Sequence, residues 1–352
     1  MDTSTTARPG RPTPRARIAG AVLGGAIGDA MGHPTEFMAV ETIRARFGPR
    51  GVEGFALRWR EGSGRFAPFT DDTQMAEAVA RGLLDAGRTA ALDDAMNAIA
   101  ARFVTWAEAP LGGHRAPGRA CLRGCRALAR GVPWARAGGL EDGGCGSVMR
   151  AYPIGAWWAA DPGRAEAWAV AHSRLTHRHP IALAACAAMA VGVARLVRGA
   201  GLAEVLGAMV GAARRHDPRT ADMMGRAIDE ARAGVGPERT LDRLRGWAAH
   251  EAIAAAVYLL ARHPEDPRAA ILEGANTPGD SDSLASLAGT LVGARVGLGA
   301  LPGDWVLDVE RSAELRGLAE ALADAAETRL AADLARDPAA GVAPTAEGRP
   351  TP

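Results

Sequence analysis

The chain has 352 residues, with 41 basic and 40 acidic side chains and a formal net charge of +1 at pH 7. This balance provides no strong field toward nucleic acid or an anionic membrane, so we expect no stable partner of either kind. Hydrophobic residues make up 48% of the chain and aromatic residues only 5%, which favours a core of Ala-rich helices over a β-sandwich.

Gly and Pro interrupt a long series of helical patterns. Residues 1–15 and 335–352 lack apolar periodicity and are expected to be disordered tails. Residues 16–334 are expected to form one all-α domain. The expected helices span 17–31, 38–47, 72–86, 92–107, 118–130, 147–159, 163–175, 180–198, 202–214, 219–233, 241–262, 266–274, 282–298 and 312–331. A short extended piece is expected only within 50–60.

Several features indicate the cellular setting. The N-terminus lacks the apolar segment of a secretory signal, and no run of 18 uncharged apolar residues indicates a membrane span. Four cysteines form no dense framework, which indicates a reduced compartment, and we expect a cytoplasmic monomer. Cys121 and Cys125 are expected to pack in the core, because no further soft ligands have suitable spacing for a metal.

Two expected helices carry glycine at every fourth position. The positions are Gly20, Gly24, Gly28 and Gly32 in the first helix and Gly289, Gly293 and Gly297 in the second. Each glycine inside a helix costs about 1 kcal/mol relative to alanine, so the repetition indicates that another backbone packs against this face. Both stripes adjoin acidic clusters. The close packing therefore either brings those clusters together or serves the core alone.

Two clusters of acids and hydroxyls stand where a helix is expected to begin. They are Thr70, Asp71 and Asp72, and Asp280, Asp282 and Ser283. Either cluster alone is explained as a helix cap whose acids complement the helix dipole. Packed face to face, the four carboxylates would repel unless a cation lay between them. Oxygen ligands favour Mg²⁺, Mn²⁺ or Ca²⁺, and the eight histidines show no HExxH-type zinc spacing.

Six sequence blocks, taken in order over about residues 17–331, resemble the ADP-ribosylglycohydrolase family. The blocks are 24–32 with Glu36, 70–73 with Met75, 144–150, 173–177 with Pro180, Asn276 with 279–283, and 301–305. This resemblance implies a compact, single-domain orthogonal helix bundle with two Mg²⁺ ions at the base of a cleft. Mn²⁺ is expected to be able to substitute.

The resemblance also implies site residues. The implied metal ligands are Thr70, Asp71, Asp72, Asp280, Asp282 and Ser283. Glu36 matches an acidic residue near the metals that contacts either a metal ion or the substrate. It is the implied catalytic group, which either protonates the leaving atom or directs a water. Asp29 is expected to support the ligands rather than bind a metal.

A glycine-rich loop over 143–147 precedes an expected helix. Its N–H groups can cradle a pyrophosphate, and a plain turn with a Ser cap is the alternative. The implied ADP-ribose-binding residues are Gly144, Cys145, Gly146, Ser147, Met149 and His177. Three residues keep two interpretations each. Arg150 either neutralises phosphate or pairs with an acid in the core, and Tyr258 either lines the adenosine side or packs in the core. His177 either hydrogen-bonds the ribose or diphosphate or is a satisfied structural group.

The function implied by the resemblance is cleavage of the C1′ glycosidic linkage between ADP-ribose and a modified acceptor. The acceptor can be a protein side chain, a nucleic acid or a small molecule. Two divalent ions can hold the vicinal ribose hydroxyls and polarise a water, while acidic surroundings stabilise positive charge on the sugar. The alternatives are a catalytically silent ADP-ribose binder on the same fold and a two-metal phosphohydrolase of another nucleotide.

The chain departs from the family pattern at one place. Several relatives carry an Asp-x-Gly sequence after the helix that ends near Trp106, with the Asp close to the scissile bond. Residues 108–115 of this chain contain no Asp. Glu108 and His114 are the candidates to replace it, and the departure concerns acceptor preference more than the metal site.

Overall fold

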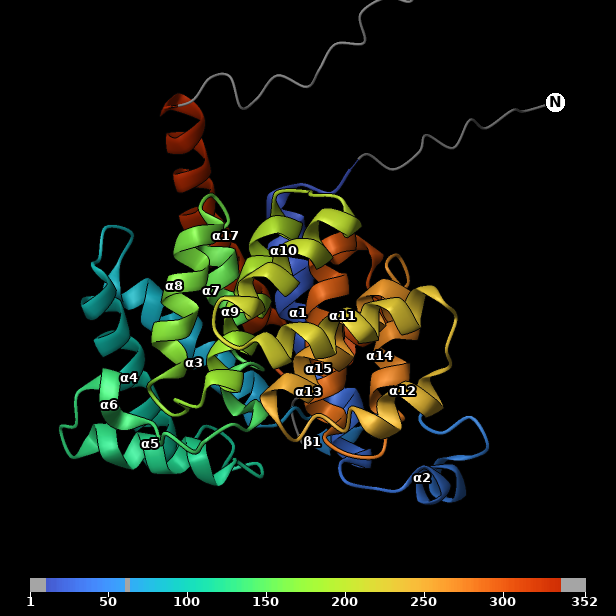
Figure 1. The fold of residues 1–352 in the computed structure, drawn as a ribbon. Helices are drawn as coiled ribbons and strands as arrows, with labels where there is room; N and C mark the ends of the chain where they lie inside the picture. Colours follow the sequence, from blue (N-terminus) through green and yellow to red (C-terminus); the bar gives the residue numbers. More distant parts are fainter. Residues whose placement is uncertain (1–10, 61–63, 337–352) are drawn as a thin grey trace, which may run out of the picture.

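The computed structural model describes residues 11–60 and 64–336, in which helices dominate (Figure 1). The α-helices are α1 (Pro14–Gly32), α2 (Val40–Phe47), α3 (Asp71–Ala86), α4 (Leu92–Glu108), α5 (Arg119–Ala129), α6 (Trp134–Ala137), α7 (Tyr152–Trp157), α8 (Pro162–Ser173), α9 (Pro180–Val197), α10 (Leu202–Arg214), α11 (Pro218–Arg232), α12 (Pro237–Arg243), α13 (Ala249–Arg262), α14 (Pro267–Ala275), α15 (Ser281–Val296), α16 (Gly303–Asp308) and α17 (Ser312–Arg336). Three 3-10 turns are η1 (His33–Thr35), η2 (Cys145–Ser147) and η3 (Leu298–Ala300). The predicted all-α class is confirmed.

Local sequence explains where many of these helices begin. Asp161, Asp217 and Asp266 precede α8, α11 and α14, and each carboxylate accepts a hydrogen bond from the N–H three residues later. A proline follows each of these caps, where its missing N–H is not needed for helical hydrogen bonds. Capping acid and proline together define the start of the helix.

The helices α1 and α15 pack backbone against backbone in the middle of the bundle (Figure 1). A side chain at Gly24 would overlap the carbonyl group of Gly289, and one at Gly20 would overlap that of Gly293. At the far end, a side chain at Gly32 would overlap the first turn of α15. The predicted close approach is thus present, and it joins the end of α1 to the beginning of α15, where the second acidic cluster lies.

The core is filled mainly by Ala, Leu, Val and Ile, as the composition predicts. Helix α9 is long and apolar enough to cross a membrane, with a mean hydropathy of 2.0, yet 78% of it is buried inside the structure. A buried core helix passes such a test by composition, and α9 packs against α7, α8, α10 and α13. It therefore serves as a central core helix of the bundle.

Several predicted elements differ in the structure. The single helix expected over 241–262 is two helices, because the chain turns at 244–248, where Gly246 has a φ of +81°. The helix expected over 147–159 begins only at Tyr152, after η2 and a turn. The short helices α6 and α16 were not predicted. Each is too short to display a periodic pattern.

The extended piece expected within 50–60 is present only at its end. Strand β1 (Arg58–Arg60) pairs antiparallel with β2 (Gly64–Phe66), and Trp59 lies opposite Arg65. The expected boundaries of the two tails were also too wide. Helix α1 already includes residues 14–15, and α17 continues through residues 335–336. Residues 1–10 and 337–352 of the expected tails lie outside the described residues.

Candidate active site

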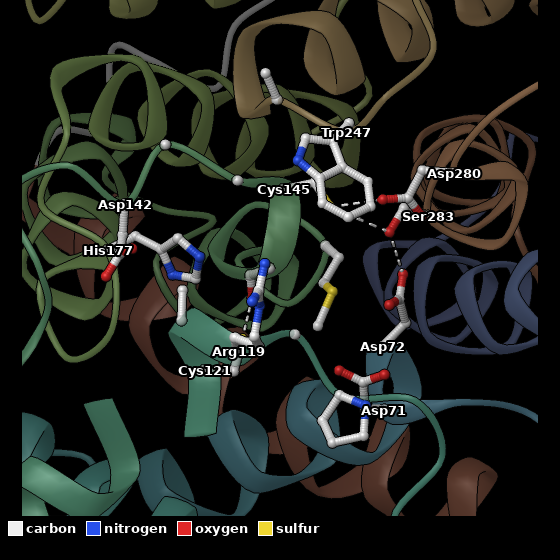
Figure 2. Close-up of a pocket in the computed structure, with 18 of the residues that line it drawn as sticks. Asp71, Asp72, Arg119, Cys121, Asp142, Cys145, His177, Trp247, Asp280 and Ser283 are labelled. Atoms are coloured by element: carbon white, nitrogen blue, oxygen red, sulfur yellow. Dashed lines mark hydrogen bonds between the residues drawn. The ribbon is translucent and has the colours of Figure 1, made fainter. Parts of the chain in front are cut away.

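A cleft of about 670 Å³ lies between α5, the glycine-rich loop, the turn at 244–248 and the first turns of α3 and α15. Seven acidic side chains line it: Glu36, Asp71, Asp72, Glu141, Asp142, Asp280 and Asp282. Figure 2 shows Asp71 and Asp72 on one side, with Asp280 and Ser283 facing Asp72. The two clusters that are remote in sequence therefore meet in one acidic cleft.

The first turn of α3 is held in place from behind by α1. Thr70 caps the helix by accepting a hydrogen bond from Asp72 N at 3.3 Å. The buried carboxylate of Asp29 accepts from Thr70 N at 2.8 Å, from Thr73 N at 3.0 Å and from Thr73 Oγ1 at 2.6 Å. Asp29 and Thr70 do not line the cleft. Asp29 instead orients the helix start that carries Asp71 and Asp72.

The first turn of α15 is fixed by contacts with three other segments. Asp280 N donates to Arg245 O at 2.8 Å. The Ser283 hydroxyl donates to Asp72 Oδ2 at 3.0 Å, and the Cys145 thiol donates to Asp280 Oδ2 at 2.9 Å. The second acidic cluster is therefore connected directly to the first cluster and to the glycine-rich loop.

Burial and mutual repulsion perturb these carboxyl groups strongly. Burial, with the neighbouring carboxylates Asp280 and Asp29, raises the pKa of Glu36 to about 7. The pKa of Asp71 is raised to about 8, first by burial and then by Asp29. Burial also raises the pKa of Asp72 and of Asp282 well above the ordinary value. The protein's own groups leave the repulsion between these carboxylates uncompensated. A divalent cation would relieve it, and carboxylate oxygens are suitable ligands for such an ion.

The glycine-rich loop is pinned to the turn that separates α12 from α13. Cys145 N donates to Trp247 O at 3.2 Å, and Ala249 N donates to Gly143 O at 2.9 Å. Gly144, Cys145, Gly146 and Met149 line the cleft. Ser147 does not: its buried hydroxyl accepts a hydrogen bond from Ser173 Oγ at 2.9 Å. The Ser147 side chain therefore belongs to the core, and only its backbone remains available to a ligand in the cleft.

A buried hydrogen-bond chain determines the state of His177. Arg150 Nη2 donates to Thr176 Oγ1 at 2.6 Å, so the Thr176 hydroxyl proton is free to point to His177 Nδ1, 2.7 Å away. Burial lowers the pKa of His177 to about 3, which keeps the ring neutral. With Nδ1 accepting, Nε2 carries the proton. That N–H group lies beside Gly144 and is a donor available to the cleft.

The structure decides between the two interpretations of Arg150 and of Tyr258. Arg150 is fully buried, with its guanidinium 4.6 Å from the Phe103 ring centroid. Tyr258 is also fully buried, and its hydroxyl donates to Val235 O at 2.7 Å. Neither residue lines the cleft. Both are therefore core residues.

The candidates for the missing Asp lie elsewhere. Glu108 and His114 line a separate pocket beside α4 and α5, and His114 Nε2 is 3.1 Å from Ala107 O. The loop after α4 is instead held by Gln74, whose Nε2 donates to Leu111 O at 2.9 Å. Neither candidate reaches the cleft in this structure, so neither replaces the missing Asp by position.

Several cleft residues were not found from the sequence, among them Phe37, Trp247 and Arg119. Phe37 and Trp247 are exposed by 53% and 65%, and their ring centroids lie 5.3 Å apart. Arg119 is exposed at the first position of α5 and lines the cleft. Arg123, one turn later on α5, forms an ion pair with Asp142. Because aromatic residues are rare in this chain, Phe37 and Trp247 could have been noticed in the sequence. Arg119 could not, because it is one of many arginines.

The bundle and its acidic cleft have counterparts among known enzymes. The family model of ADP-ribosylglycohydrolase matches residues 10–332, so the chain belongs to that family and is a hydrolase. Enzymes of this family are metal-dependent in general.

Curated relatives and a solved structure agree with this assignment. The chain is 28% identical over 316 residues to the ADP-ribosyl-[dinitrogen reductase] glycohydrolase of Rhodospirillum rubrum, covering 88% of this chain and 97% of the relative. It is 29% identical over 326 residues to an ADP-ribosylarginine hydrolase of Pseudomonas putida, covering 88% and 78%. A solved ADP-ribosylglycohydrolase-related protein complex matches with a TM-score of 0.65 at 26% identity, covering 89% of this chain and 99% of the solved one.

Proposed function

We propose that this protein is a Mg²⁺-dependent hydrolase that cleaves the C1′ glycosidic linkage between ADP-ribose and an acceptor. Mn²⁺ would be able to replace Mg²⁺. The observation that carries the proposal is the meeting of two acid-bearing helix starts in one cleft, joined by the hydrogen bond from Ser283 to Asp72. The family match supports the reaction class.

The residues proposed to hold two cations are Asp71, Asp72, Asp280, Asp282 and Ser283, which line the cleft, and Thr70, which directly precedes Asp71 as the cap of α3. When bound, such a pair of ions supplies positive charge that holds vicinal ribose hydroxyls and lowers the pKa of a water. The protein's own part is to keep the ligand carboxylates in place. Asp29 does so for the start of α3, and the Arg245 carbonyl does so for Asp280.

Glu36 is proposed to handle the proton of the reaction. Burial, the first cause of its raised pKa of about 7 in the metal-free protein, also acts when cations are bound and favours the protonated carboxyl. A carboxyl in that state can donate a proton to the leaving atom, and the resulting carboxylate can then accept one from the attacking water. The surrounding carboxylates would also stabilise positive charge that develops on the ribose.

The rest of the cleft suits the ADP part of the ligand. The backbone N–H of Gly146, next to Cys145 in η2, and the Nε2–H of His177 offer hydrogen-bond donors to a diphosphate. Arg119 offers a guanidinium that makes no ion pair among the described residues. The exposed rings of Phe37 and Trp247 offer an aromatic face for adenine at the cleft mouth.

A protein acceptor is supported by the names of the two curated enzymes, one acting on dinitrogen reductase and one on ADP-ribosylarginine. The test is to incubate the full chain with defined ADP-ribosylated Arg, Ser and DNA substrates, with and without Mg²⁺. Free ADP-ribose should appear only with the cation. Release of AMP or inorganic phosphate would indicate a phosphohydrolase, and tight ADP-ribose binding without turnover of any substrate would indicate a silent binder.

A further inference from the structure

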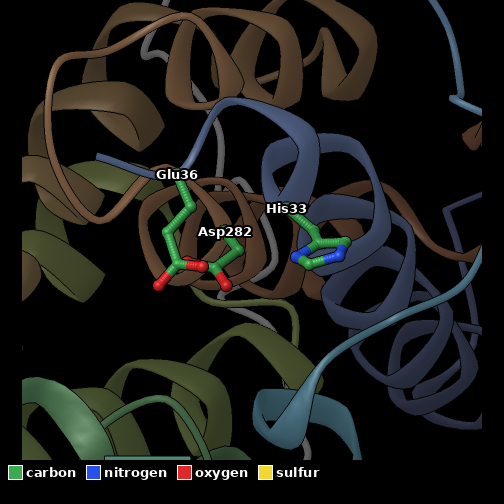
Figure 3. A group of neighbouring side chains, drawn as sticks. All are labelled: His33, Glu36 and Asp282. Carbon is green, nitrogen blue, oxygen red and sulfur yellow. The ribbon is translucent and has the colours of Figure 1, made fainter. Parts of the chain in front are cut away.

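A histidine lies beside two of the acidic groups of the cleft (Figure 3). His33, Glu36 and Asp282 each offer one ligand atom, and these three atoms lie within 4.8 Å of one another. His33 and Glu36 are three residues apart across η1, whereas Asp282 belongs to the first turn of α15. Figure 3 shows the Glu36 and Asp282 carboxylates close together, with the His33 ring beside them.

Buried hydrogen bonds fix this arrangement. The Thr35 hydroxyl lies 2.8 Å from Gly32 O, 2.6 Å from Ala275 O and 3.1 Å from Ser281 Oγ. Ser281 Oγ in turn donates to Gly32 O at 2.9 Å. These contacts join the η1 turn directly to the residue before Asp282. The relative position of His33 and Asp282 is therefore determined by the backbone packing of α1 on α15.

The chain after Glu36 is also constrained. Phe37 has a φ of +56°, a conformation that side chains with a Cβ rarely adopt, and its N–H donates to Gly279 O at 2.6 Å. Strained backbone of this kind is kept where surrounding contacts over-determine it. The constrained backbone at Phe37 holds Glu36 beside Asp282. The side chains of His33, Glu36 and Asp282 therefore lie together without any change in main-chain conformation.

The His33 ring contains an atom whose hydrogen-bonding capacity is unused. Nδ1 is buried and has no hydrogen-bond partner in the described structure. Buried polar atoms are nearly always paired, so an orphaned nitrogen on a ring that lies beside two carboxylates is itself a sign of a missing ligand. A neutral imidazole offers one lone pair, and a divalent cation between the carboxylates is a chemically suitable partner.

We propose that His33 supplies a nitrogen ligand to the cation held by Asp282, beside Glu36, so that this position selects a transition-metal ion such as Mn²⁺ or Co²⁺ over Mg²⁺. The inference rests on the proposed metal centre and goes beyond its oxygen ligands. Imidazole favours later transition metals, whereas Mg²⁺ prefers oxygen ligands. The two cation positions of the cleft would then differ, one with oxygen ligands only and one with mixed nitrogen and oxygen ligands.

The test uses pulsed electron paramagnetic resonance on the full chain loaded with Mn²⁺. The wild type should show modulation from a directly coordinated ¹⁴N nucleus, and His33→Ala should lose it. His114→Ala is the matched control, since His114 lies in a separate pocket, and it should retain the ¹⁴N signal. Calorimetry should show Mn²⁺ affinity reduced by at least about tenfold in His33→Ala, the lower end of what loss of a metal's supporting groups costs, with Mg²⁺ affinity nearly unchanged.

The outcomes separate this inference from the proposed function. Absence of any Mn²⁺ or Mg²⁺ binding by the wild type would overturn both. Mn²⁺ binding without a ¹⁴N signal, or with a signal that persists in His33→Ala, would overturn the role of His33 alone. His33→Gln, which keeps a polar side chain of similar length, serves as a second variant if the alanine variant fails to fold. It should also lose the imidazole modulation.

Discussion

Asp72 and Ser283 lie 211 residues apart in the chain, yet the Ser283 hydroxyl donates to Asp72 Oδ2 at 3.0 Å. Each residue stands in the first turn of its helix, so each acidic cluster alone is an ordinary helix start. The contact brings carboxylates from both clusters into one buried site and gives them raised pKa values.

A divalent cation should stabilise the folded chain. A cation that binds only the folded state at 100 times its dissociation constant adds about 2.7 kcal/mol, so Tm should rise across millimolar Mg²⁺ in a thermal melt. Asp282→Asn should lose most of the rise. Asp94→Asn, which changes an exposed acid in the first turn of α4, should keep it. A wild-type melting curve that ignores Mg²⁺ and Mn²⁺ would refute the metal site.

The metal-free protein should become less stable as pH rises. Glu36 and Asp71 have folded-state pKa values of about 7 and about 8, against ordinary values of 4.5 and 3.8. At pH values between the ordinary and the raised pKa values, the folded chain keeps protons that the unfolded chain has released. The free energy of unfolding therefore falls as the pH rises. Urea unfolding in chelator, from pH 5.5 upward to about 8, should show the decline, and Mg²⁺ should reverse it. A flat profile would contradict the burial of these acids.

Replacement of Glu36 should separate chemistry from binding. Glu36→Gln removes the titrating proton and should lower turnover by about 10²–10⁴-fold, the range for loss of a general acid or base. The affinity for free ADP-ribose, measured on the same preparation, should change far less. Glu108→Gln, whose site lies in another pocket, should leave turnover intact. Full activity of Glu36→Gln would remove this residue from the mechanism.

The glycine-rich loop should tolerate a methyl group at Gly144 structurally but lose ligand affinity. A Cβ there would lie 3.7 Å from His177 Nε2 and 3.8 Å from Trp247 O, which are ordinary contacts. It would occupy space beside the His177 donor, and calorimetry should show ADP-ribose binding weakened by roughly 1–3 kcal/mol. Gly207→Ala, where nothing lies within 4 Å of the added Cβ, should bind normally. Equal affinity in both variants would exclude the loop as the diphosphate site.

A valine at Gly146 is a less selective test of the same loop. A Cβ at Gly146 would lie only 2.7 Å from Cys121 Sγ and 3.1 Å from His177 Cε1, so the loop itself would have to move. Gly146→Val should therefore weaken ADP-ribose binding and also lower thermal stability. A drop in Tm for Gly146→Val but not for Gly144→Ala would distinguish displacement of the loop from occupation of the cleft.

Arg119 should contribute affinity only for phosphate-bearing ligands. Arg119→Gln removes a guanidinium from a cleft lined by seven acids, and the loss should be roughly tenfold for ADP-ribose at low ionic strength, shrinking as salt screens the exposed charge. Adenosine should bind equally to both forms. Arg126→Gln, on an exposed position of the same helix, is the control. An equal loss for adenosine and ADP-ribose would point to a steric effect instead of charge.

Sequence patterns predicted those features of the fold that depend on residues close together in the chain. Helix periodicity predicted most helices of the bundle, and the glycine repeats predicted that another backbone packs against each of these two helices. The break at 244–248 was missed because Leu244 and Trp247 continue an apolar pattern and only Gly246 interrupts it. This break in the helix determines the position of Trp247 at the cleft.

Tertiary packing decided the residues that sequence left open. Arg150 and Tyr258 each carry a polar tip that suits a ligand or the core equally, and only their complete burial distinguishes the two roles. His33 gave no signal of its own, because one histidine after a glycine has no characteristic spacing. The approach of α15 brings an acid to its ring, and that approach depends on glycines up to thirteen residues earlier, from Gly20 to Gly32.

The pairing of α1 with α15 also has a consequence for synthesis of the protein on the ribosome. Gly24 of α1 and Gly289 of α15 are in contact although they lie far apart in the sequence, so the cleft cannot assemble before α15 has been synthesised. Until then, the glycine face of α1 stays uncovered. Domains with such long-range contacts pay a large loop-closure cost before the contacts form. Catalytic competence therefore arrives late, and fragments ending before α15 should be inert toward ADP-ribosylated targets.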